Sequence, residues 1–452
     1  MMSFKKIAII VSSIALLIVI GIYTGKALTY QTKFLPKTMI NDMDISNKTV
    51  FQVNKELQKS YRGKTFVATE GGMELFKFTG SDVGITDDFT ESLTLIKDQQ
   101  DQWSWPIRIL KNKVQKEKLE KTTYNKETFA GFFAGLPLVS ANRIKPENAK
   151  IEKNESNFNL KPEVMGNTFD LDKVKASLIT TIESEETRIS LDDYYQKPTI
   201  YKDNPELIKI TNEANSLSKL DISYLIVDQK ETISAERLFQ WISLDAENNI
   251  MIDEDKVTSY LTELATKYST KTKSRKFVST KKGIVDVPPG IYGWTFLVND
   301  EVNSLVADIR TKTNLQDREP KHEGSGYGVD IGKTYVEVDL TNQHMWFYKD
   351  GVVALETDVV TGKPTTPTPP GAFYIWNREP NAILRGVDYE TPVKYWMPID
   401  WDGVGIHDSN WQPAYGGNLY LTVGSHGCIN TPPGVMEKLF AIAPVGTPVL
   451  VF

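Results

Sequence analysis

A long uncharged apolar stretch near the N-terminus restricts this chain more than any other feature of its sequence. Residues 7–25, IAIIVSSIALLIVIGIYTG, follow Lys5 and Lys6 and contain no charged residue. In a helix that rises about 1.5 Å per residue, this stretch nearly crosses a hydrocarbon core of roughly 30 Å. We therefore predict a transmembrane signal anchor at residues 7–25. Residues 1–6 would be cytoplasmic, and the chain from about residue 27 onward would lie outside the membrane.

The alternative to an anchor is a signal peptide that is cleaved. Such a peptide usually has a shorter apolar core and ends in a small-x-small site, of which GKALTY, residues 25–30, is a poor version. Lys26 weakens the charge asymmetry that sets the orientation of a span. No second apolar run of comparable length follows, so a single pass with the C-terminal part outside the cytoplasm is the interpretation that we favour.

Length and charge exclude several other classes of protein. A chain of 452 residues is too long for one compact domain and indicates two to four. The net charge is −6 and no dense basic stripe occurs, so we expect no nucleic-acid partner. We also expect no metal and no cofactor, because the chain has one cysteine and four scattered histidines. We interpret two of these histidines, His322 and His344, as structural or solvated.

The single cysteine, Cys428, lies in GSHGCINTPPG, residues 424–434. Outside the cytoplasm a lone thiol cannot form an intramolecular disulfide and is open to oxidation. Cys428 is therefore either a small buried hydrophobic residue or a nucleophile, and the residue count alone does not choose between the two.

The region between the anchor and the C-terminal domain has the pattern of two α+β modules, at residues 34–200 and 203–320. In the first we expect a helix capped by Ser46 and a hairpin at residues 64–80 around Gly71 and Gly72. In the second we expect a helix at 251–268, a hairpin at 275–290 and, at 292–309, a strand-like turn that leads into a helix. FDLDKVKASLITTI, residues 169–182, resembles the start of the 251–268 helix. The modules are two diverged copies or a chance similarity of common patterns, and spacing or binding is their expected role.

The last domain begins after a polar, glycine-containing stretch at residues 312–330, which we interpret as a flexible junction. From residue 334 on, short segments of alternating apolar character predict a mainly antiparallel β domain with one evident helix at 433–443. GNLYLTVG, residues 417–424, is one of the predicted strands. The predicted fold is thus multidomain, with an N-terminal transmembrane helix, two α+β modules and a C-terminal mainly-β domain.

Two histidines are candidates for the base that a nucleophilic Cys428 would need. His426 is two residues away, which in an extended segment places it on the same face. His407 ends a predicted strand, and an antiparallel neighbour would bring it beside Cys428. Backbone N–H groups at the turn would lower the energy of the thiolate and bind an oxyanion. Spacing alone does not select the base.

The motifs around Cys428 resemble a known family. IHDSNW at 406–411 and SHGCIN at 425–430 resemble the catalytic motif of L,D-transpeptidases with a YkuD-type domain. EVDLTNQHMWFYKDG, TGKPTTPTPPGAFYI and GTPVLV extend the resemblance over residues 333–452. FLPKTMINDMDIS and VDVPPGIYGW more weakly resemble the modules, assigned to peptidoglycan binding, that precede this domain in Gram-positive L,D-transpeptidases.

The resemblance implies a role for each motif residue. Cys428 matches the nucleophile, and His407 matches the general base and acid. Asp408 would orient His407 through its carbonyl or its carboxylate. The N–H groups of Gly427 and Cys428 would bind the oxyanion, and two further residues flank the nucleophile in the motif: Ser425 and His426.

Substrate-binding residues are less sharply indicated. Three aromatic residues either line a donor groove or pack in the core: Tyr395, Trp396 and Trp411. Arg385 either meets a carboxylate of a stem peptide or is an ordinary surface charge. Asn430 matches a polar motif residue, and stabilising a turn is at least as good an explanation of it.

The function implied by the resemblance is peptidoglycan L,D-transpeptidation at the cell membrane. Cys428 would be acylated by a stem tetrapeptide donor with release of D-Ala, and an acceptor amine of a second stem would complete a 3→3 cross-link. Carbapenem β-lactams would acylate the same thiol. The alternatives are an L,D-carboxypeptidase, in which water attacks the acyl-enzyme, and a catalytically silent wall-binding protein. The residues around Cys428 do not resemble a sortase.

Overall fold

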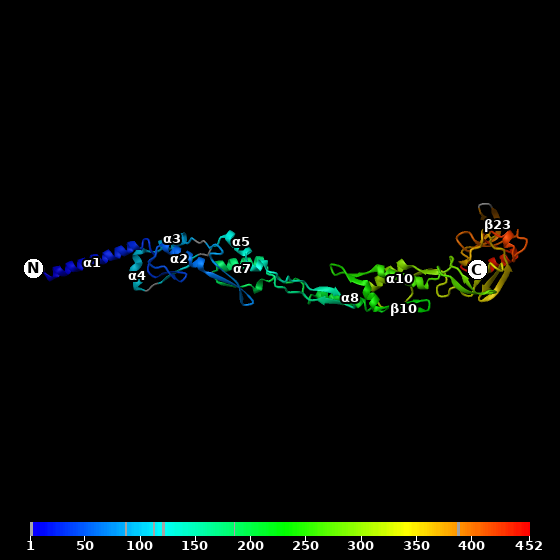
Figure 1. Ribbon diagram of the computed structural model, residues 1–452, viewed down its shortest axis with the longest axis horizontal. Helices are drawn as coiled ribbons and strands as arrows, with labels where there is room; N and C mark the ends of the chain where they lie inside the picture. The colour runs from blue at the N-terminus through cyan, green and yellow to red at the C-terminus, as the bar shows by residue number, and fades with distance from the viewer. Residues whose placement is uncertain (1–2, 86–87, 112–113, 120–122, 185, 387–388) are drawn as a thin grey trace. The chain divides into compact units, whose positions relative to one another are not determined.

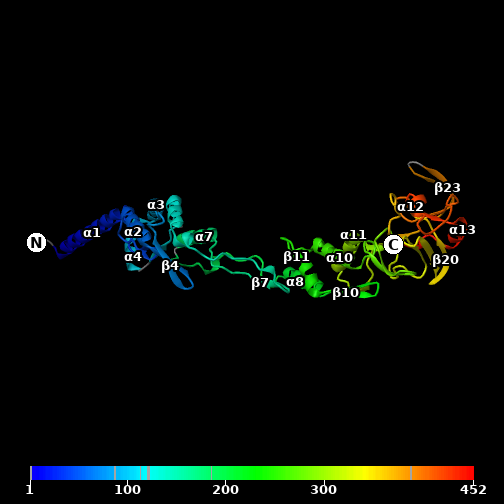
Figure 2. The ribbon, with the colours of Figure 1, turned by 45° about the vertical axis from the view of Figure 1, so that its right-hand side comes forward.

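The computed structural model describes residues 3–85, 88–111, 114–119, 123–184, 186–386 and 389–452. By its internal contacts the chain divides into two compact units (Figures 1 and 2). Unit 1 comprises residues 1–150 and 161–202, and unit 2 comprises residues 151–160 and 203–452. Residues 1–2 of the expected cytoplasmic segment lie outside the described residues.

Unit 1 begins with the apolar helix α1, Phe4–Thr29. Among the described residues, α1 is the one helix long and apolar enough to cross a membrane, and the apolar window that qualifies it is wholly unburied. The helix continues beyond the predicted limit at residue 25, and its last turn enters the folded unit, where Ala27 is fully buried. Exposed apolar side chains are unfavourable in water, so this helix requires an apolar environment around it.

The rest of unit 1 is an α+β domain around a three-stranded sheet of order β4-β3-β8. Thr49 caps its first helix in a capping box with Gln52, so the predicted cap at Ser46 is wrong by three residues. The hairpin turns at Gly71 and Gly72, as predicted, and both have positive φ. The described elements of this domain are β1 (Thr38–Ile40), β2 (Met43–Asp44), α2 (Val50–Gly63), β3 (Thr65–Glu70), β4 (Met73–Thr79), α3 (Thr90–Asp98), η1 (Gln102–Ser104), α4 (Trp105–Leu110), β5 (Gln115–Glu117), α5 (Lys126–Ala134), α6 (Pro137–Ser140), α7 (Leu171–Glu183), β8 (Arg188–Ser190) and η2 (Asp192–Tyr194).

The first part of unit 2 is a second α+β domain whose main sheet has the order β10-β9-β16. Its sheet has the same topology as that of unit 1, an antiparallel pair with a third strand parallel to the inner one. The described elements are β6 (Lys150–Lys153), β7 (Phe158–Lys161), α8 (Pro205–Leu217), β9 (Ile222–Ile226), β10 (Gln229–Ile233), α9 (Ala235–Trp241), β11 (Ile242–Leu244), β12 (Ile250–Ile252), α10 (Glu254–Tyr268), β13 (Arg275–Ser279), β14 (Gly283–Val287), β15 (Trp294–Phe296), α11 (Val298–Arg310), β16 (Leu315–Arg318) and β17 (His322–Gly324).

This topology changes the element pairing that the sequence suggested. In each sheet the third strand directly follows a helix, α7 before β8 and α11 before β16. By its place in the topology, α7 of the first domain therefore corresponds to α11 of the second. The sequence had suggested instead that it corresponds to α10, whose residue pattern it shares. The predicted flexible junction at 312–330 is also wrong, since β16 and β17 lie within it and both are paired.

Two hairpins pack against parts of unit 2 that follow them in the sequence. The hairpin β6–β7 contributes Phe158 to the core around α8 and α9, and Asn215 exchanges two hydrogen bonds with the Phe158 backbone, at 2.9 and 2.8 Å. The hairpin β13–β14 packs on the C-terminal domain, where Phe277 contacts Tyr335 and Phe452.

The C-terminal domain is mainly β, as predicted, and is built from two sheets with orders β20-β19-β18-β26-β21 and β22-β23-β24-β25. Apolar side chains from both sheets and from α13 form its core. The predicted strand at 417–424 is wrong, because residues 420–423 form the short helix α12. The described elements are β18 (Tyr335–Asp339), β19 (His344–Lys349), β20 (Val352–Asp358), β21 (Gly371–Tyr374), β22 (Glu379–Arg385), β23 (Glu390–Pro398), β24 (Gly405–Asp408), α12 (Tyr420–Val423), β25 (Ile429–Thr431), α13 (Pro433–Ile442) and β26 (Pro448–Val451).

A buried carboxylate holds the β13–β14 hairpin to the C-terminal domain. Glu337 on β18 is 1% exposed and accepts hydrogen bonds from the Thr280 backbone N–H, at 2.8 Å, and from the Thr280 hydroxyl, at 2.7 Å. Burial raises the pKa of Glu337. Beside it, Lys282 forms an ion pair of 3.0 Å with the buried Asp339. A buried acid that loses its donors is costly, so these contacts fix the hairpin's position.

We expect Thr280→Val to lower the free energy of unfolding of unit 2 by about 1–3 kcal/mol, because a buried acceptor on Glu337 loses its hydroxyl donor. Urea denaturation of the purified chain, followed by tryptophan fluorescence, measures this change. Thr262→Val, at an exposed position of α10, is the matched control and should change stability by less than about 0.5 kcal/mol. Equal effects of the two substitutions would contradict the proposed contribution of the hydroxyl.

Candidate active site

The candidate site is organised by three neighbouring strands, β23, β24 and β25. β24 pairs antiparallel with β23, which places Trp396 opposite His407. On its other side β24 pairs in parallel with β25, which places Asn430 opposite His407. The antiparallel neighbour expected from the sequence is therefore wrong. The parallel pairing brings the start of β24 level with the start of β25, with Ile406 opposite Ile429, and Cys428 immediately precedes β25.

The turn that leads to Cys428 is closed by Ser425. The Ser425 hydroxyl donates to the Cys428 carbonyl at 2.6 Å and accepts from the Gly427 N–H at 3.0 Å. Gly427 has φ +125°, a conformation that residues with a side chain rarely adopt. The predicted use of the Gly427 N–H as an oxyanion donor is not what this geometry shows, because that group is already bonded to Ser425.

A second loop, residues 361–370, supports the turn from outside. The Lys363 N–H and the Thr366 hydroxyl both donate to the Ser425 carbonyl, each at 3.0 Å. The Thr368 hydroxyl donates to the Gly427 carbonyl at 2.7 Å. Sequence reasoning missed these supporting residues, although TGKPTTPTPPG is one of the stretches that resemble the family.

His407 is 3% exposed and its imidazole has a defined tautomer. Nδ1 lies 2.9 Å from the Asp408 carbonyl oxygen, and because a carbonyl can only accept, Nδ1 carries the proton. Nε2 is then free of a proton and can accept one. Of the two predicted orienting groups, the structure uses the Asp408 carbonyl. The Asp408 carboxylate instead accepts the Tyr395 backbone N–H at 2.8 Å. Burial lowers the pKa of His407, which favours the neutral ring.

Cys428 is also buried, and its thiol is neutral at rest. Burial raises its pKa to about 11; a hydrogen bond from the Gly405 backbone opposes this shift, and the charge of Asp400 adds to it. The sulfur lies 3.6 Å from the Gly403 carbonyl oxygen, to which a protonated thiol can donate. The sequence predicts that local N–H groups lower the energy of the thiolate. The Gly405 backbone acts in this direction, but burial outweighs it and the pKa of Cys428 is raised.

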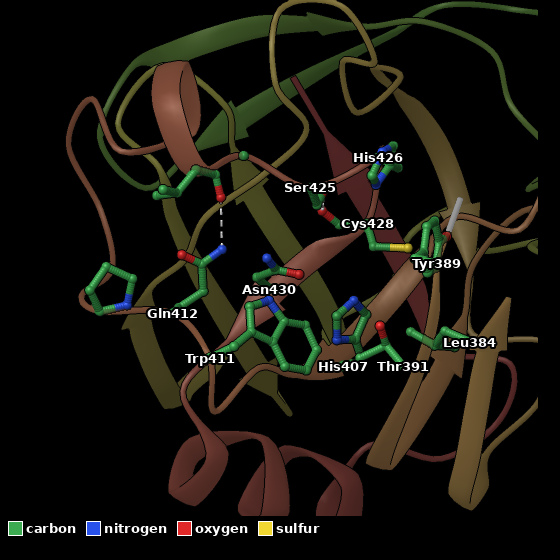
Figure 3. Close-up of a pocket in the computed structure, with 13 residues that line it drawn as sticks. Leu384, Tyr389, Thr391, His407, Trp411, Gln412, Ser425, His426, Cys428 and Asn430 are labelled. Carbon is green, nitrogen blue, oxygen red and sulfur yellow. Dashed lines mark hydrogen bonds between the residues drawn. The ribbon is translucent and has the colours of Figure 1, made fainter. Parts of the chain in front are cut away.

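His426 is positioned differently from His407. It is exposed, its ring stacks on Tyr389 with centroids 5.0 Å apart, and its Nε2 lies 3.3 Å from the Lys363 ammonium. In Figure 3, Cys428 is drawn between the two histidine rings. A buried imidazole held at Nδ1 is preorganised for proton transfer, whereas one at the rim is not. The geometry thus favours His407 as the base.

The site opens into a pocket of about 340 Å³. Figure 3 shows the β22–β23 hairpin residues on one side and Trp411 with Gln412 on the other. Two predicted substrate-binding residues, Trp411 and Asn430, lie in the lining, and the Asn430 side-chain oxygen is buried without a hydrogen-bond partner. Several lining residues were not predicted: Leu384, Tyr389, Thr391, Gln412, Pro413 and Val423.

Three other predicted substrate-binding residues lie outside this lining. Tyr395 packs on Phe440, with ring centroids 5.0 Å apart. Trp396 lies over Gly405, where a Cβ would come within 2.4 Å of its ring, and faces His407 at 5.9 Å. Arg385 is exposed and pairs with Glu390 across the hairpin at 3.4 Å. These predictions are wrong for the pocket, because the strand alternation directs the first two side chains into packing.

Charge and metal chemistry are limited in this region. Within the part of the chain that the structure describes, no group of three or more histidine, cysteine or acidic residues is arranged to hold a metal ion. Asp400, whose charge acts on the thiol, is buried with a raised pKa and accepts the backbone N–H groups of Asp402 and Val404. The arrangement of the described residues suits acyl transfer by a thiol with one imidazole.

We expect the alkylation of Cys428 by iodoacetamide to be slow at neutral pH and to rise about tenfold per pH unit toward pH 10. The reason is that only the thiolate reacts and the thiol's pKa is about 11. Mass spectrometry of the intact chain measures the rate. In urea, the same thiol should titrate near the ordinary value of about 8.5. A rate that is already level between pH 6 and 8 would instead indicate a thiolate–imidazolium pair.

We expect Gly427→Ala to destabilise the C-terminal domain by about 1–2 kcal/mol, because the alanine would have to keep φ +125°. Gly434→Ala is the matched control. Gly434 lies in α13 with open space around its would-be Cβ, so alanine there should stabilise by about 0.5–1 kcal/mol. Thermal unfolding distinguishes the two, and a neutral Gly427→Ala would show that the turn can relax.

The sequence matches two known families. Residues 333–451 match YkuD, described as the L,D-transpeptidase catalytic domain, and residues 211–318 match a family described as "Putative peptidoglycan binding domain". Among curated proteins, L,D-transpeptidase 1 of Mycobacterium tuberculosis is 27% identical over 133 residues, covering 27% of this chain and 52% of the relative. The chain thus spans about half the length of the curated relatives it matches.

Solved structures give higher identities. A crystal structure of an Enterococcus faecium L,D-transpeptidase with a cysteine-to-serine mutation is 49% identical, covering 53% of this chain and 98% of that chain, with a TM-score of 0.48. The catalytic domain from E. faecium L,D-transpeptidase acylated by ertapenem is 68% identical, covering 27% and 98%, with a TM-score of 0.26. The chain therefore carries a YkuD L,D-transpeptidase catalytic domain at residues 333–451, preceded by a peptidoglycan-binding domain at residues 211–318.

Proposed function

We propose that the chain is a peptidoglycan L,D-transpeptidase that forms 3→3 cross-links through a thioester on Cys428. The observation that carries this proposal is the pairing of β24 with β25. It places a buried imidazole with an unprotonated Nε2 and the only thiol of the chain in the lining of one pocket. The match to the YkuD domain indicates the reaction class. Cys428 would be its nucleophile and His407 its base.

The first step transfers the donor acyl group to sulfur. Cys428 Sγ attacks the carbonyl carbon of the third residue of a stem tetrapeptide, and its proton passes to His407 Nε2 as the C–S bond forms. Because thiol and imidazole both begin neutral, charge develops only in the transition state, inside a buried site. The amide C–N bond then breaks, His407 protonates the departing amine, and D-Ala leaves.

Stabilisation of the oxyanion is assigned to the backbone N–H of Cys428. The Gly427 N–H would join it only by leaving the Ser425 hydroxyl, to which it donates at 3.0 Å. Ser425 therefore acts as a positioning residue that shapes the turn. The Asn430 side chain, opposite His407 and in the pocket lining, provides a polar contact for the bound peptide.

The second step releases the enzyme. The side-chain amine of another stem attacks the thioester, His407 accepts its proton, and the C–S bond breaks with return of a proton to sulfur. The energy of the broken amide is held in the thioester, so the reaction needs no nucleotide. This suits a catalytic domain outside the cytoplasmic membrane, with α1 as its single-pass anchor.

The remaining parts of the chain are assigned supporting roles. The domain at residues 211–318 would bind peptidoglycan, as would the module of unit 1, whose sheet has the same topology. Carbapenems would acylate Cys428, by analogy with the E. faecium domain acylated by ertapenem.

We expect Cys428→Ala to abolish cross-linking and His407→Ala to lower its rate by about 10²–10⁴-fold, the usual contribution of a positioned acid–base group. His426→Ala should keep measurable activity, since its ring faces Tyr389 and Lys363. The measurement is mass spectrometry of the purified chain incubated with disaccharide-tetrapeptide, which detects the thioester, D-Ala loss and the product.

The same spectra separate the alternatives. A cross-linked dimer supports transpeptidation, whereas a tripeptide without dimer would identify a carboxypeptidase. Absence of any acyl-enzyme, with either the tetrapeptide or a carbapenem, would indicate a silent wall-binding protein. If His426→Ala were inactive and His407→Ala active, the role of base would pass to His426.

A further inference from the structure

A cluster of exposed apolar side chains lies beside the end of α1. We call it the juxtamembrane surface and define it by Trp103, Ile107, Ile109 and Leu110, on η1 and α4. Ile107 is 54% exposed and Leu110 is 82% exposed. Single exposed apolar residues are ordinary, but four exposed apolar side chains within eight positions are a concentration that water does not favour. The catalytic reaction assigns this surface no task.

Contacts with α1 determine where this surface lies. The Tyr23 hydroxyl donates to the Trp103 carbonyl at 3.0 Å, and the Trp105 indole N–H donates to the Tyr23 carbonyl at 3.3 Å. The ring of Tyr23 lies 5.6 Å from that of Trp103 and 6.2 Å from that of Trp105. Figures 1 and 2 both show α4 beside the C-terminal end of α1. Along the axis of α1, the juxtamembrane surface therefore lies beside Tyr23, which Trp103 contacts directly.

The level of Tyr23 along α1 is the edge of a bilayer. At about 1.5 Å per residue, the uncharged stretch from residue 7 to residue 25 spans about 28 Å, close to a hydrocarbon core of roughly 30 Å. Tyr23 lies two residues from the end of this stretch, within about 3 Å of the boundary. Tyrosine and tryptophan rings, which are apolar with one polar end, are the side chains that favour this interface.

The helix is joined rigidly to unit 1, so the surface cannot drift away from the boundary. Ala27 is fully buried, and the Tyr30 hydroxyl donates to the Asn47 side chain at 2.9 Å. The Lys26 ammonium lies 5.1 Å from the centre of the Trp105 ring. A helix that ends inside a folded domain transmits its position to that domain, unlike a flexible tether.

The charges around the surface fit a phospholipid partner. Lys26 and the exposed Lys111 flank the surface with positive charge. Arg108 is half-buried, donates to the Gln115 side chain and is influenced by the charge of Glu117. The acid Asp101 accepts the Trp103 backbone N–H as the cap of η1. Cations beside exposed apolar and indole side chains match the phosphate groups and acyl boundary of an anionic membrane.

We propose that residues 102–110 form an interfacial membrane-binding element, which inserts Trp103, Ile107 and Leu110 into the outer leaflet of an anionic phospholipid bilayer. Unit 1 is then held against the membrane by two contacts, the span of α1 and this element. The proposal rests on the proposed anchoring by α1 and is independent of the chemistry at Cys428. The element fixes the orientation of unit 1 on the membrane, which a single helix would leave free to rotate.

Depth-dependent fluorescence quenching tests the proposal on the full chain. Cys428→Ser removes the only native cysteine, and Leu110→Cys introduces one for a nitrobenzoxadiazole label. The protein is reconstituted in phosphatidylglycerol-containing vesicles with doxyl-labelled lipids. We expect a blue-shifted label at position 110, quenched most by nitroxides near the headgroup. Met73→Cys, at an equally exposed apolar position on the β3–β4 hairpin of the same unit, should remain unquenched.

Leu16→Cys in α1 provides the positive control for the anchor itself. Quenching at position 16 without quenching at position 110 would overturn the membrane-binding element and leave the anchor standing. No quenching at position 16 would overturn the anchor, and the element with it. Neither result bears on transpeptidation, which the wild-type chain reports separately.

A charge substitution checks that the apolar surface is the cause. Ile107→Glu in the labelled chain should reduce quenching at position 110 severalfold while quenching at position 16 is unchanged. Ile208→Glu, at an exposed apolar position of α8, is the matched control and should have no effect. Undiminished quenching in Ile107→Glu would contradict insertion of this face.

Discussion

The parallel pairing of β24 with β25 is the constraint on which the catalytic site depends. Its backbone hydrogen bonds join two segments that are separated by residues 409–428, which include α12. The pairing places His407 opposite Asn430. Cys428 enters the pocket because it directly precedes β25. The Ser425 turn and the threonines of the 361–370 loop then hold the approach to that strand in a conformation that only glycine adopts easily at position 427.

Burial has two consequences at this site. It raises the pKa of Cys428 and lowers that of His407, so the resting pair is neutral. A neutral thiol is less open to oxidation than a thiolate, because the thiolate is the reactive form. In the mechanism that we propose, Cys428 loses its proton to His407 only as the sulfur attacks a substrate carbonyl. The same dry surroundings strengthen the hydrogen bonds that stabilise the developing oxyanion.

Within unit 2, two hairpins pack against the domains that follow them in the sequence. The β6–β7 hairpin lies in the core of the domain that follows it, and the β13–β14 hairpin binds the catalytic domain through Thr280 and Glu337. At the other end of the chain, α1 ends inside unit 1 with Ala27 buried.

The sequence by itself determined the features that are local. The charge-free stretch at residues 7–25 predicts α1, the glycines at 71 and 72 predict their hairpin, and the motifs around Cys428 indicate the family and the mainly-β domain.

Tertiary structure decided what depends on distant partners. Residues 420–423 form a helix where a strand was expected, β25 pairs in parallel with β24, and the 312–330 stretch is ordered because β16 and β17 find strands far away in the sequence. Strand pairing, burial and the direction of a side chain such as Tyr395 or Trp396 are set by neighbours that no local pattern specifies. For this reason a candidate nucleophile and base could be proposed from sequence, whereas the pocket walls and the neutral state of the thiol could not.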